Sequence, residues 1–191
     1  MTDAILAPAP PRPRTMVHPG PVAPVRLQAA QAPAARHVRL ALQPGRTLQD
    51  ALVGPLQALG VQCASMTLLG GPLAELHYCV AVDDPTGERV ATYARPIEAG
   101  AAFFIFGNAT LGRGPDARPI VHCHATFALA DGTVRGGHVV VDRSRVGATP
   151  IAVLVTTLDG IDLRLSYDDE THMPLMRPAP SDAIQETRHD R

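Results

Sequence analysis

The chain contains no lysine, and all 17 of its basic residues are arginine. Catalysis through a lysine Schiff base or a lysine general base is therefore excluded. A phosphate-binding loop of the Walker type, which needs a lysine, is excluded as well. The formal net charge is −1, so no overall electrostatic attraction draws the chain to nucleic acid or to acidic membranes.

Aromatic residues are also scarce: there is no tryptophan, with 4 phenylalanines and 3 tyrosines. A protein that stacks unpaired bases usually presents more rings, so such a surface is not expected. The three cysteines, Cys63, Cys79 and Cys123, are far apart and form no CxxC motif, which favours buried thiols in a reducing compartment. No apolar run reaches the roughly 20 residues of a membrane span, and no apolar signal core precedes the first prolines. We expect a cytoplasmic protein with no membrane partner.

Proline divides the chain into three parts. Residues 1–36 hold eight of the 19 prolines and many alanines, so we expect an extended or disordered N-terminal arm. Residues 37–177 form the predicted domain, and residues 178–191 form a polar, mobile tail. We expect this arm to lie on a neighbouring subunit. The arm has a local charge of +3, because it contains four arginines and one aspartate: Arg12, Arg14, Arg26, Arg36 and Asp3.

The domain begins with an alternating strand from Val38 to Leu42, followed by a helical pattern. Thr47 can cap this helix, whose apolar face is Leu48, Leu52, Leu56 and Leu59. Because Gly54-Pro55 interrupts the pattern, we expect a kink or two short helices.

Short strands separated by turns follow. The predicted strands are 63–69 (stopped by Gly70-Gly71-Pro72), 75–82, 88–95, 101–110, two around the histidines, 151–158 and 162–167. These elements predict an α+β fold with a largely antiparallel sheet and one or two short helices.

Three histidines stand close together in the predicted hairpin. His122 and His124 are two residues apart, so on a strand they share a face, with Cys123 pointing into the core. A three-residue turn at Ala130-Asp131-Gly132, with Gly132 left-handed, places His138 directly opposite His124. A two-residue Asp131-Gly132 turn would instead send His138 to the other face. Only the first register matches the apolar faces of the two strands, although a bulge at Gly136-Gly137 would upset it.

Three neutral imidazoles this close suit a metal such as zinc and leave it an open coordination position. Nickel, copper and iron share the preference for imidazole. The alternative is a set of hydrogen-bonded histidines at a subunit interface. Glu75 and Glu98 are candidates for a general base only by elimination.

The ordered pieces resemble the PPC (plants-and-prokaryotes-conserved) domain. The resemblance runs from about residue 39 to residue 175. It includes Leu42-Gln43-Pro44-Gly45, Phe106-Gly107-Asn108, Val121-His122-Cys123-His124, Asp131-Gly132-Thr133-Val134, Gly136-Gly137-His138 and Gly147-Ala148-Thr149. It implies an antiparallel α+β fold, a homotrimer, and a metal, zinc in many bacterial members, held by His122, His124 and His138.

Side chains near the histidines in sequence are candidates for ligand binding. Arg113 and Arg135 could recognise a carboxylate or phosphate beside a metal. Asn108 and Thr110 could line the same pocket, or they could be turn residues that cap their strand. His77 is expected on the polar face of its strand, and His18 could approach a site in a neighbouring subunit. The remaining histidines, His37, His172 and His189, are expected in solvent.

Three functions follow from this reading. The first is a metal-binding homotrimer that takes a small, anionic ligand. The second is a DNA-associated regulator, because plant relatives pair the domain with AT-hooks. The nearest stretch here, residues 11–14, lacks the glycine of an AT-hook, although three basic arms in a trimer could contact phosphates. The third is a zinc-dependent enzyme acting on a small molecule.

Overall fold

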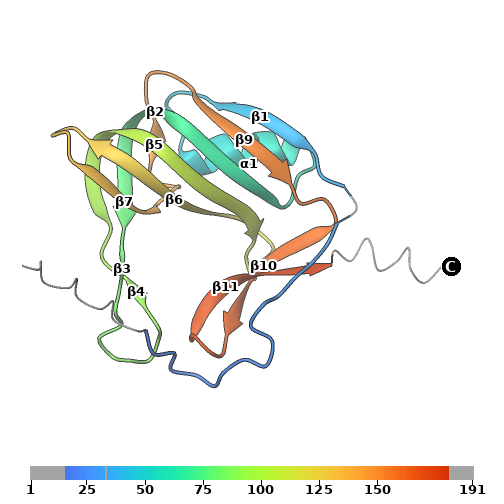
Figure 1. Ribbon diagram of the computed structural model, residues 1–191. Helices are drawn as coiled ribbons and strands as arrows, with labels where there is room; N and C mark the ends of the chain where they lie inside the picture. The colour runs from blue at the N-terminus through green and yellow to red at the C-terminus, as the bar shows by residue number, and fades with distance from the viewer. Residues whose placement is uncertain (1–15, 33, 181–191) are drawn as a thin grey trace, which may run out of the picture.

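The computed structural model describes residues 16–32 and 34–180, and they form a mostly antiparallel β-sheet with one helix (Figure 1). The nine-stranded sheet has the order β1-β9-β2-β7-β6-β5-β10-β11, with β8 also on β2 and a further β2–β5 pairing. Strands β3 and β4 form a separate small sheet. The element bounds are β1 (His37–Leu42), α1 (Leu48–Ala58), β2 (Ala64–Cys79), β3 (Ala81–Val82), β4 (Thr92–Tyr93), β5 (Ile97–Arg113), β6 (Pro119–Leu129), β7 (Val134–Val139), β8 (Arg145–Val146), β9 (Ile151–Thr157), β10 (Ile161–Asp168) and β11 (Met173–Pro180).

Helix α1 is one continuous short helix, within the predicted one or two, and it is not divided at Gly54-Pro55. Thr47 caps it as predicted, because its Oγ1 accepts a hydrogen bond of 3.0 Å from the backbone N–H of Asp50. Pro55 lies inside the helix and removes only one backbone donor. The fully buried Leu48, Leu52 and Leu56 hold the helix on the sheet despite that loss.

Strand β2 corrects a second expectation. It runs through Gly70-Gly71-Pro72, where the sequence predicts a turn. A Cβ on Gly71 would lie 2.6 Å from Cγ1 of Ile151, so this glycine allows a close approach between strands rather than a turn. The predicted strand over residues 88–95 is reduced to Thr92–Tyr93 in the structure.

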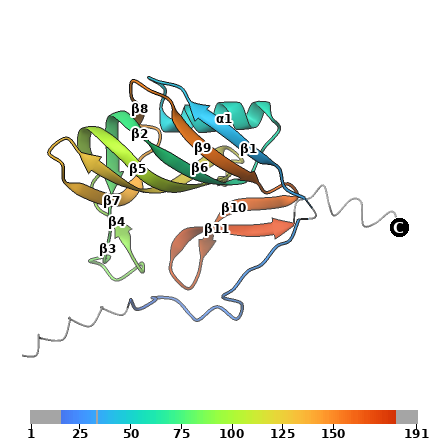
Figure 2. The ribbon, with the colours of Figure 1, turned by 45° about the horizontal axis from the view of Figure 1, so that its top comes forward.

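The core lies between α1 and one face of the sheet. Its largest fully buried side chains include Leu52, Met66, Leu68, Phe104 and Phe127. Figure 2 shows α1 above the sheet, with β3–β4, β10–β11 and the arm on the other side. Side chains that alternate with the core positions therefore face β3–β4 and β10–β11.

The arm has no helix or strand over the residues that the structure describes, and it lies on its own chain. Gly20 donates a backbone hydrogen bond of 3.0 Å to the carbonyl of Glu170, in the turn between β10 and β11. Arg36 forms an ion pair of 3.0 Å with Asp159. The remaining arm residues, 1–15 and 33, lie outside the described residues, as do the predicted mobile tail beyond Pro180 and His189. No helix among the described residues is long and apolar enough to cross a membrane.

Candidate metal centre

The β6–β7 hairpin has the predicted three-residue register. His124 pairs with His138, and Ala128 pairs with Val134. Gly132 has φ 81°, in the left-handed region that glycine adopts without strain. The two-residue alternative is therefore wrong, and the register places all three histidines on one face of the sheet.

The three imidazoles form one cluster. The ring centroid of His122 lies 4.8 Å from those of His124 and His138, and the other pair is 5.3 Å apart. One nitrogen from each ring can be chosen so that all three lie within 4.8 Å of one another. This is the single group of three or more potential metal-ligating side chains found in the part of the chain that the structure describes.

Two of the three imidazoles, His122 and His138, favour the neutral form. Burial, followed by the neighbouring His124, lowers the pKa of His122. Burial, followed by His122 and His124, lowers the pKa of His138 to about 4. Because a metal ligand must be an unprotonated nitrogen, both shifts prepare the site for a cation at neutral pH.

The donor set fits a metal ion. The Nδ1 atom of His138 is buried and has no hydrogen-bond partner among the described residues. A buried nitrogen without a partner is costly, and coordination of a cation would satisfy it. Zinc–nitrogen bonds of about 2.0–2.1 Å in a tetrahedron place donors roughly 3.4 Å apart, so small ring rotations would close the cluster around an ion.

Strand β5 supplies polar neighbours on the same face. Asn108 pairs with His124, and Thr110 pairs with His122. Asn108 is exposed and Thr110 is half-buried. Both therefore lie beside the histidines, as the sequence analysis anticipated.

Neither predicted arginine is brought to the cluster as a free cation. Arg113 makes a two-pronged ion pair with the buried Asp162, with Nε–Oδ1 at 2.9 Å and Nη2–Oδ2 at 2.6 Å. Arg135 pairs across the hairpin with the core residue Phe127, so alternation places it on the face opposite His138.

His77 lies among polar side chains, as expected, and it is buried, with 3% of its surface exposed. Its Nε2 lies 2.8 Å from Oε1 of Glu75, and its Nδ1 lies 4.0 Å from Oε1 of Glu98. The two carboxylates also pair with arginines: Glu98 with Arg143 at 2.7 Å, and Glu75 with Arg145 at 3.8 Å. Glu75 and Glu98 thus belong to an ion-pair cluster around His77.

Tyr93 is a neighbour that the sequence analysis missed. Its ring centroid lies 4.8 Å from that of His138, with an interplanar angle of 33°. Strand β4 carries it there because Tyr93 pairs with Ala81, two residues after the Cys79 that pairs with His138. This proximity depends on two separate strand pairings, so no local sequence pattern predicts it. Cys123, in contrast, is in the core as expected, and burial raises the pKa of its thiol to about 12.

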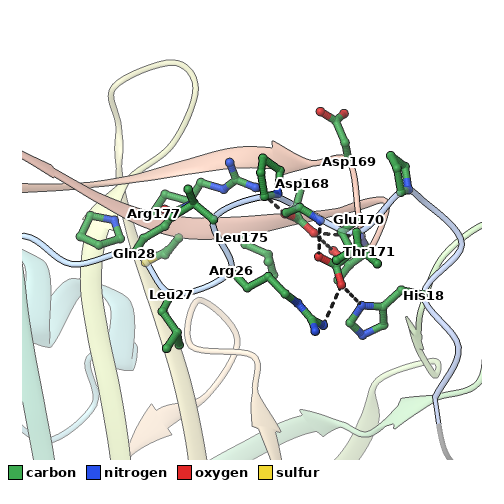
Figure 3. Close-up of a pocket in the computed structure, with 17 residues that line it drawn as sticks. His18, Arg26, Leu27, Gln28, Asp168, Asp169, Glu170, Thr171, Leu175 and Arg177 are labelled. Atoms are coloured by element: carbon green, nitrogen blue, oxygen red, sulfur yellow. Dashed lines mark hydrogen bonds and ion pairs between the residues drawn. The ribbon is translucent and has the colours of Figure 1, made fainter.

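A second polar cluster holds the arm. The Glu170 carboxylate lies 2.7 Å from Nδ1 of His18 and 2.7 Å from Nη2 of Arg26, and it accepts a hydrogen bond of 2.8 Å from the backbone N–H of Ala23 (Figure 3). These contacts border a cavity of about 750 Å³ between the arm and β10–β11. Here, unlike at the three histidines, the buried carboxylate has cationic and backbone donors from its own chain.

Several solved structures share this fold. A plant- and prokaryote-conserved (PPC) protein from Pyrococcus horikoshii is similar in structure, with TM-score 0.60, 17% identity, and coverage of 80% of this chain and 100% of that chain. A metal-containing protein from Archaeoglobus fulgidus has TM-score 0.60 and 19% identity, covering 80% of this chain and 99% of that one. A candidate DNA-binding protein from Ralstonia eutropha has TM-score 0.57 and 15% identity, and the match covers 72% of this chain and 88% of that chain. At these identities the likeness establishes the fold alone.

No curated protein matches this chain. The profile of the Plants and Prokaryotes Conserved (PCC) domain, the PPC domain named above, matches residues 29–159. This match covers well over half of the chain and includes all three histidines. The chain therefore belongs to the Plants and Prokaryotes Conserved domain family.

Proposed function

We propose that this protein is a zinc-binding homotrimer that uses the open coordination position of its metal to bind a small anionic ligand. The observation that carries the proposal is the cluster of His122, His124 and His138, whose ligand nitrogens lie within 4.8 Å of one another. The buried Nδ1 of His138, which no described group satisfies, supports it. A similar fold in a metal-containing archaeal protein is consistent with it.

The histidines and their β5 neighbours would have different roles in this site. The imidazoles would hold the ion, and the hairpin register keeps them on one face. When bound, zinc supplies positive charge and one open position for an oxygen donor. Asn108 and Thr110 are neutral and pair with His124 and His122 between β5 and β6, so an anion at the metal would meet no carboxylate from the cluster itself.

An apolar surface on β5 supports the homotrimer. Phe103, Ile105 and Phe106 are 52%, 42% and 46% exposed. We call these three residues the β5 patch. Exposed aromatic and aliphatic side chains grouped on one strand mark a contact surface more often than a free one. A second copy of the chain would cover the patch.

Metal analysis tests the proposal. Protein purified without added metal is expected to contain about one zinc per chain, measured by mass spectrometry of the elements. His124→Ala is expected to lose it. His37→Ala is the matched control, because His37 is exposed on β1 and outside the cluster. A wild-type protein that neither contains zinc nor takes it up after chelation would refute the metal site.

DNA binding is the alternative suggested by the candidate DNA-binding relative. The structure describes two of the four arm arginines, and both are paired, Arg26 with Glu170 and Arg36 with Asp159. Arg12 and Arg14 lie outside the described residues. Binding through the arm predicts duplex affinity that falls steeply with salt and is lost when residues 1–36 are removed.

A zinc-dependent enzyme is the third function, and it requires a proton acceptor within reach of the metal. The candidates Glu75 and Glu98 are engaged around His77, each with an arginine. Turnover of a small molecule that rises and falls with zinc occupancy would support this function over simple ligand binding.

A further inference from the structure

The polar side chains around the three histidines make no hydrogen bonds with other described residues. Asn108 and Thr110 reach the cluster from β5, and Tyr93 reaches it from β4. Elsewhere in the molecule, polar side chains such as Glu170 and Asp162 are held by two or three partners of the chain itself. At the centre, by contrast, the buried Nδ1 of His138 has no partner among the described residues, so a group from outside would satisfy it.

We propose that Tyr93 is a ligand-contacting residue of the three-histidine centre, and that its phenol hydroxyl donates a hydrogen bond to a small carboxylate bound at the metal. This inference rests on the proposed metal site and adds the chemical class of its ligand. The ring centroid of Tyr93 lies 4.8 Å from that of His138, so this tyrosine is in contact with the cluster. With 43% of its surface exposed, Tyr93 is reachable by a ligand from solvent.

The charges around the site favour a singly charged oxyanion over a phosphate. Recognition of a phosphate usually uses one or more guanidinium groups. Arg113 is committed to Asp162, and Arg135 lies on the other face of the hairpin. The donors left at the centre are neutral: a phenol, an amide and a hydroxyl. The proposed metal ion and these few neutral donors match the charge and hydrogen-bonding capacity of a carboxylate.

The chain also fixes the position of the β3–β4 hairpin that carries Tyr93. The hairpin is outside the main sheet, and its loop is tied to the turn between β10 and β11. Val90 donates a backbone hydrogen bond of 3.0 Å to Thr171, and Nδ1 of His172 lies 2.8 Å from the carbonyl oxygen of Glu88. Tyr93 is therefore held over the histidines by contacts remote from them, as a preorganised ligand contact requires.

The test uses the full chain loaded with Co²⁺, whose visible absorption reports on the groups bound to the ion. Acetate is the probe, and inorganic phosphate is the comparison anion. Tyr93→Phe keeps the ring against His138 and removes only the hydroxyl. We expect it to bind Co²⁺ as the wild type does, and to bind acetate about tenfold more weakly because one hydrogen bond to a charged acceptor is lost. Tyr167→Phe is the matched control, since Tyr167 is an exposed tyrosine on β10, and its acetate affinity should be unchanged.

The outcomes separate this inference from the metal proposal. If the wild type binds no Co²⁺ or zinc, the metal site fails, and the role of Tyr93 fails with it. If Co²⁺ binds but acetate leaves the spectrum unchanged, or acetate affinity is equal in Tyr93→Phe, the metal site stands and Tyr93 is not a ligand contact. Tighter binding of phosphate than of acetate would overturn the carboxylate assignment. A Tyr93→Phe variant that loses Co²⁺ itself would show that the tyrosine shapes the cluster instead of the ligand.

Discussion

His124 and His138 lie directly opposite each other on β6 and β7, with ring centroids 5.3 Å apart. Two residues separated by a turn in the sequence are thus neighbours on one face of the sheet. The third histidine, His122, joins them because it is two residues from His124 on the same strand. The geometry of the centre is therefore a consequence of one strand register, and any change that shifts β7 should move His138 relative to the other two rings.

The pKa of His138 predicts how stability depends on pH in the metal-free protein. His138 titrates at about 4 in the folded chain, against an ordinary value near 6.5, chiefly because it is buried. The unfolded chain therefore takes up a proton more readily. The stabilising contribution of neutral His138 is complete above pH 6.5 and is lost as the pH falls toward 4. We expect the free energy of unfolding to fall over that window, with a slope below about 1.4 kcal/mol per pH unit since the ring is only half-buried.

Denaturant unfolding from pH 4 to pH 8 measures this slope. The groups that face His138 are His122 and His124 in the cluster, Tyr93 from β4, and Cys79, its cross-strand partner on β2. His138→Phe removes the titrating ring while keeping an apolar one, so the difference between the two proteins isolates its contribution from that of His122 and the carboxylates. Identical slopes in the two proteins would contradict the prediction.

The two glycines before His138 offer a matched test of the register. A Cβ on Gly137 would lie 2.7 Å from the carbonyl oxygen of Cys79 on β2, a backbone atom that cannot move alone. A Cβ on Gly136 would meet its nearest atom, the carbonyl oxygen of Ala125, at 3.3 Å. Gly137→Ala should therefore push β7 away from β2, lower stability by about 1–3 kcal/mol, and weaken zinc binding. Gly136→Ala should change stability by less than about 1 kcal/mol.

Calorimetric zinc titration and thermal unfolding measure the zinc affinity and the stability of Gly137→Ala and Gly136→Ala. Equal zinc affinity in both variants would mean that the centre tolerates a shift of β7, and the dependence on register would be wrong.

Local patterns were sufficient to predict the hairpin and its histidines. Alternation of Val121, Cys123 and Ala125 with His122 and His124 identifies the two faces of β6, and the turn at Gly132 sets the partner strand. These signals act over a few residues, so a single sequence contains them. The helix cap at Thr47 was predictable for the same reason.

Other parts of the structure depend on contacts between distant segments. The sequence Gly70-Gly71 predicts a turn, but in the structure Gly71 allows strand β2 to approach Ile151, which is more than 70 residues away in the chain. Strand β11 contains prolines and was not predicted. It pairs only with β10 at the edge of the sheet, where proline is tolerated. Tyr93 reaches His138 through the β3–β4 and β2–β7 pairings, which no local pattern encodes.

Glu170 should control the docking of the arm. The backbone N–H of Ala23, the imidazole of His18 and the guanidinium of Arg26 hold the pKa of its carboxyl below the usual range. The charged carboxylate therefore favours the docked arm above the ordinary pKa near 4.5, and this effect is lost as the pH falls through the lowered pKa. Glu170→Gln removes the charge at neutral pH. We expect backbone amides in residues 16–28 to exchange with deuterium about tenfold faster in this variant.

Asp169→Asn is the matched control for the arm. Asp169 precedes Glu170 and is exposed, and Figure 3 shows its carboxylate pointing away from His18 and Arg26. Exchange in residues 16–28 should match the wild type in this variant. If Glu170→Gln leaves exchange in the arm unchanged, the arm is held by its apolar contacts and not by the carboxylate.

The β5 patch should decide the oligomeric state. Phe103 is 52% exposed in a single chain, and a homotrimer would bury it against a second copy. Phe103→Asp places a charge without a partner in that contact, which costs several kcal/mol at each interface. We expect sedimentation to show three chains per particle in the wild type and mainly single chains in the variant at micromolar concentration.

Leu154→Asp, with Leu154 47% exposed on β9, is the control and should sediment as the wild type does. A wild type that sediments as a single chain would contradict the homotrimer. A Phe103→Asp variant that stays trimeric would show that the β5 patch lies outside the interface, because an apolar contact at the core of an interface does not accept an unpaired carboxylate.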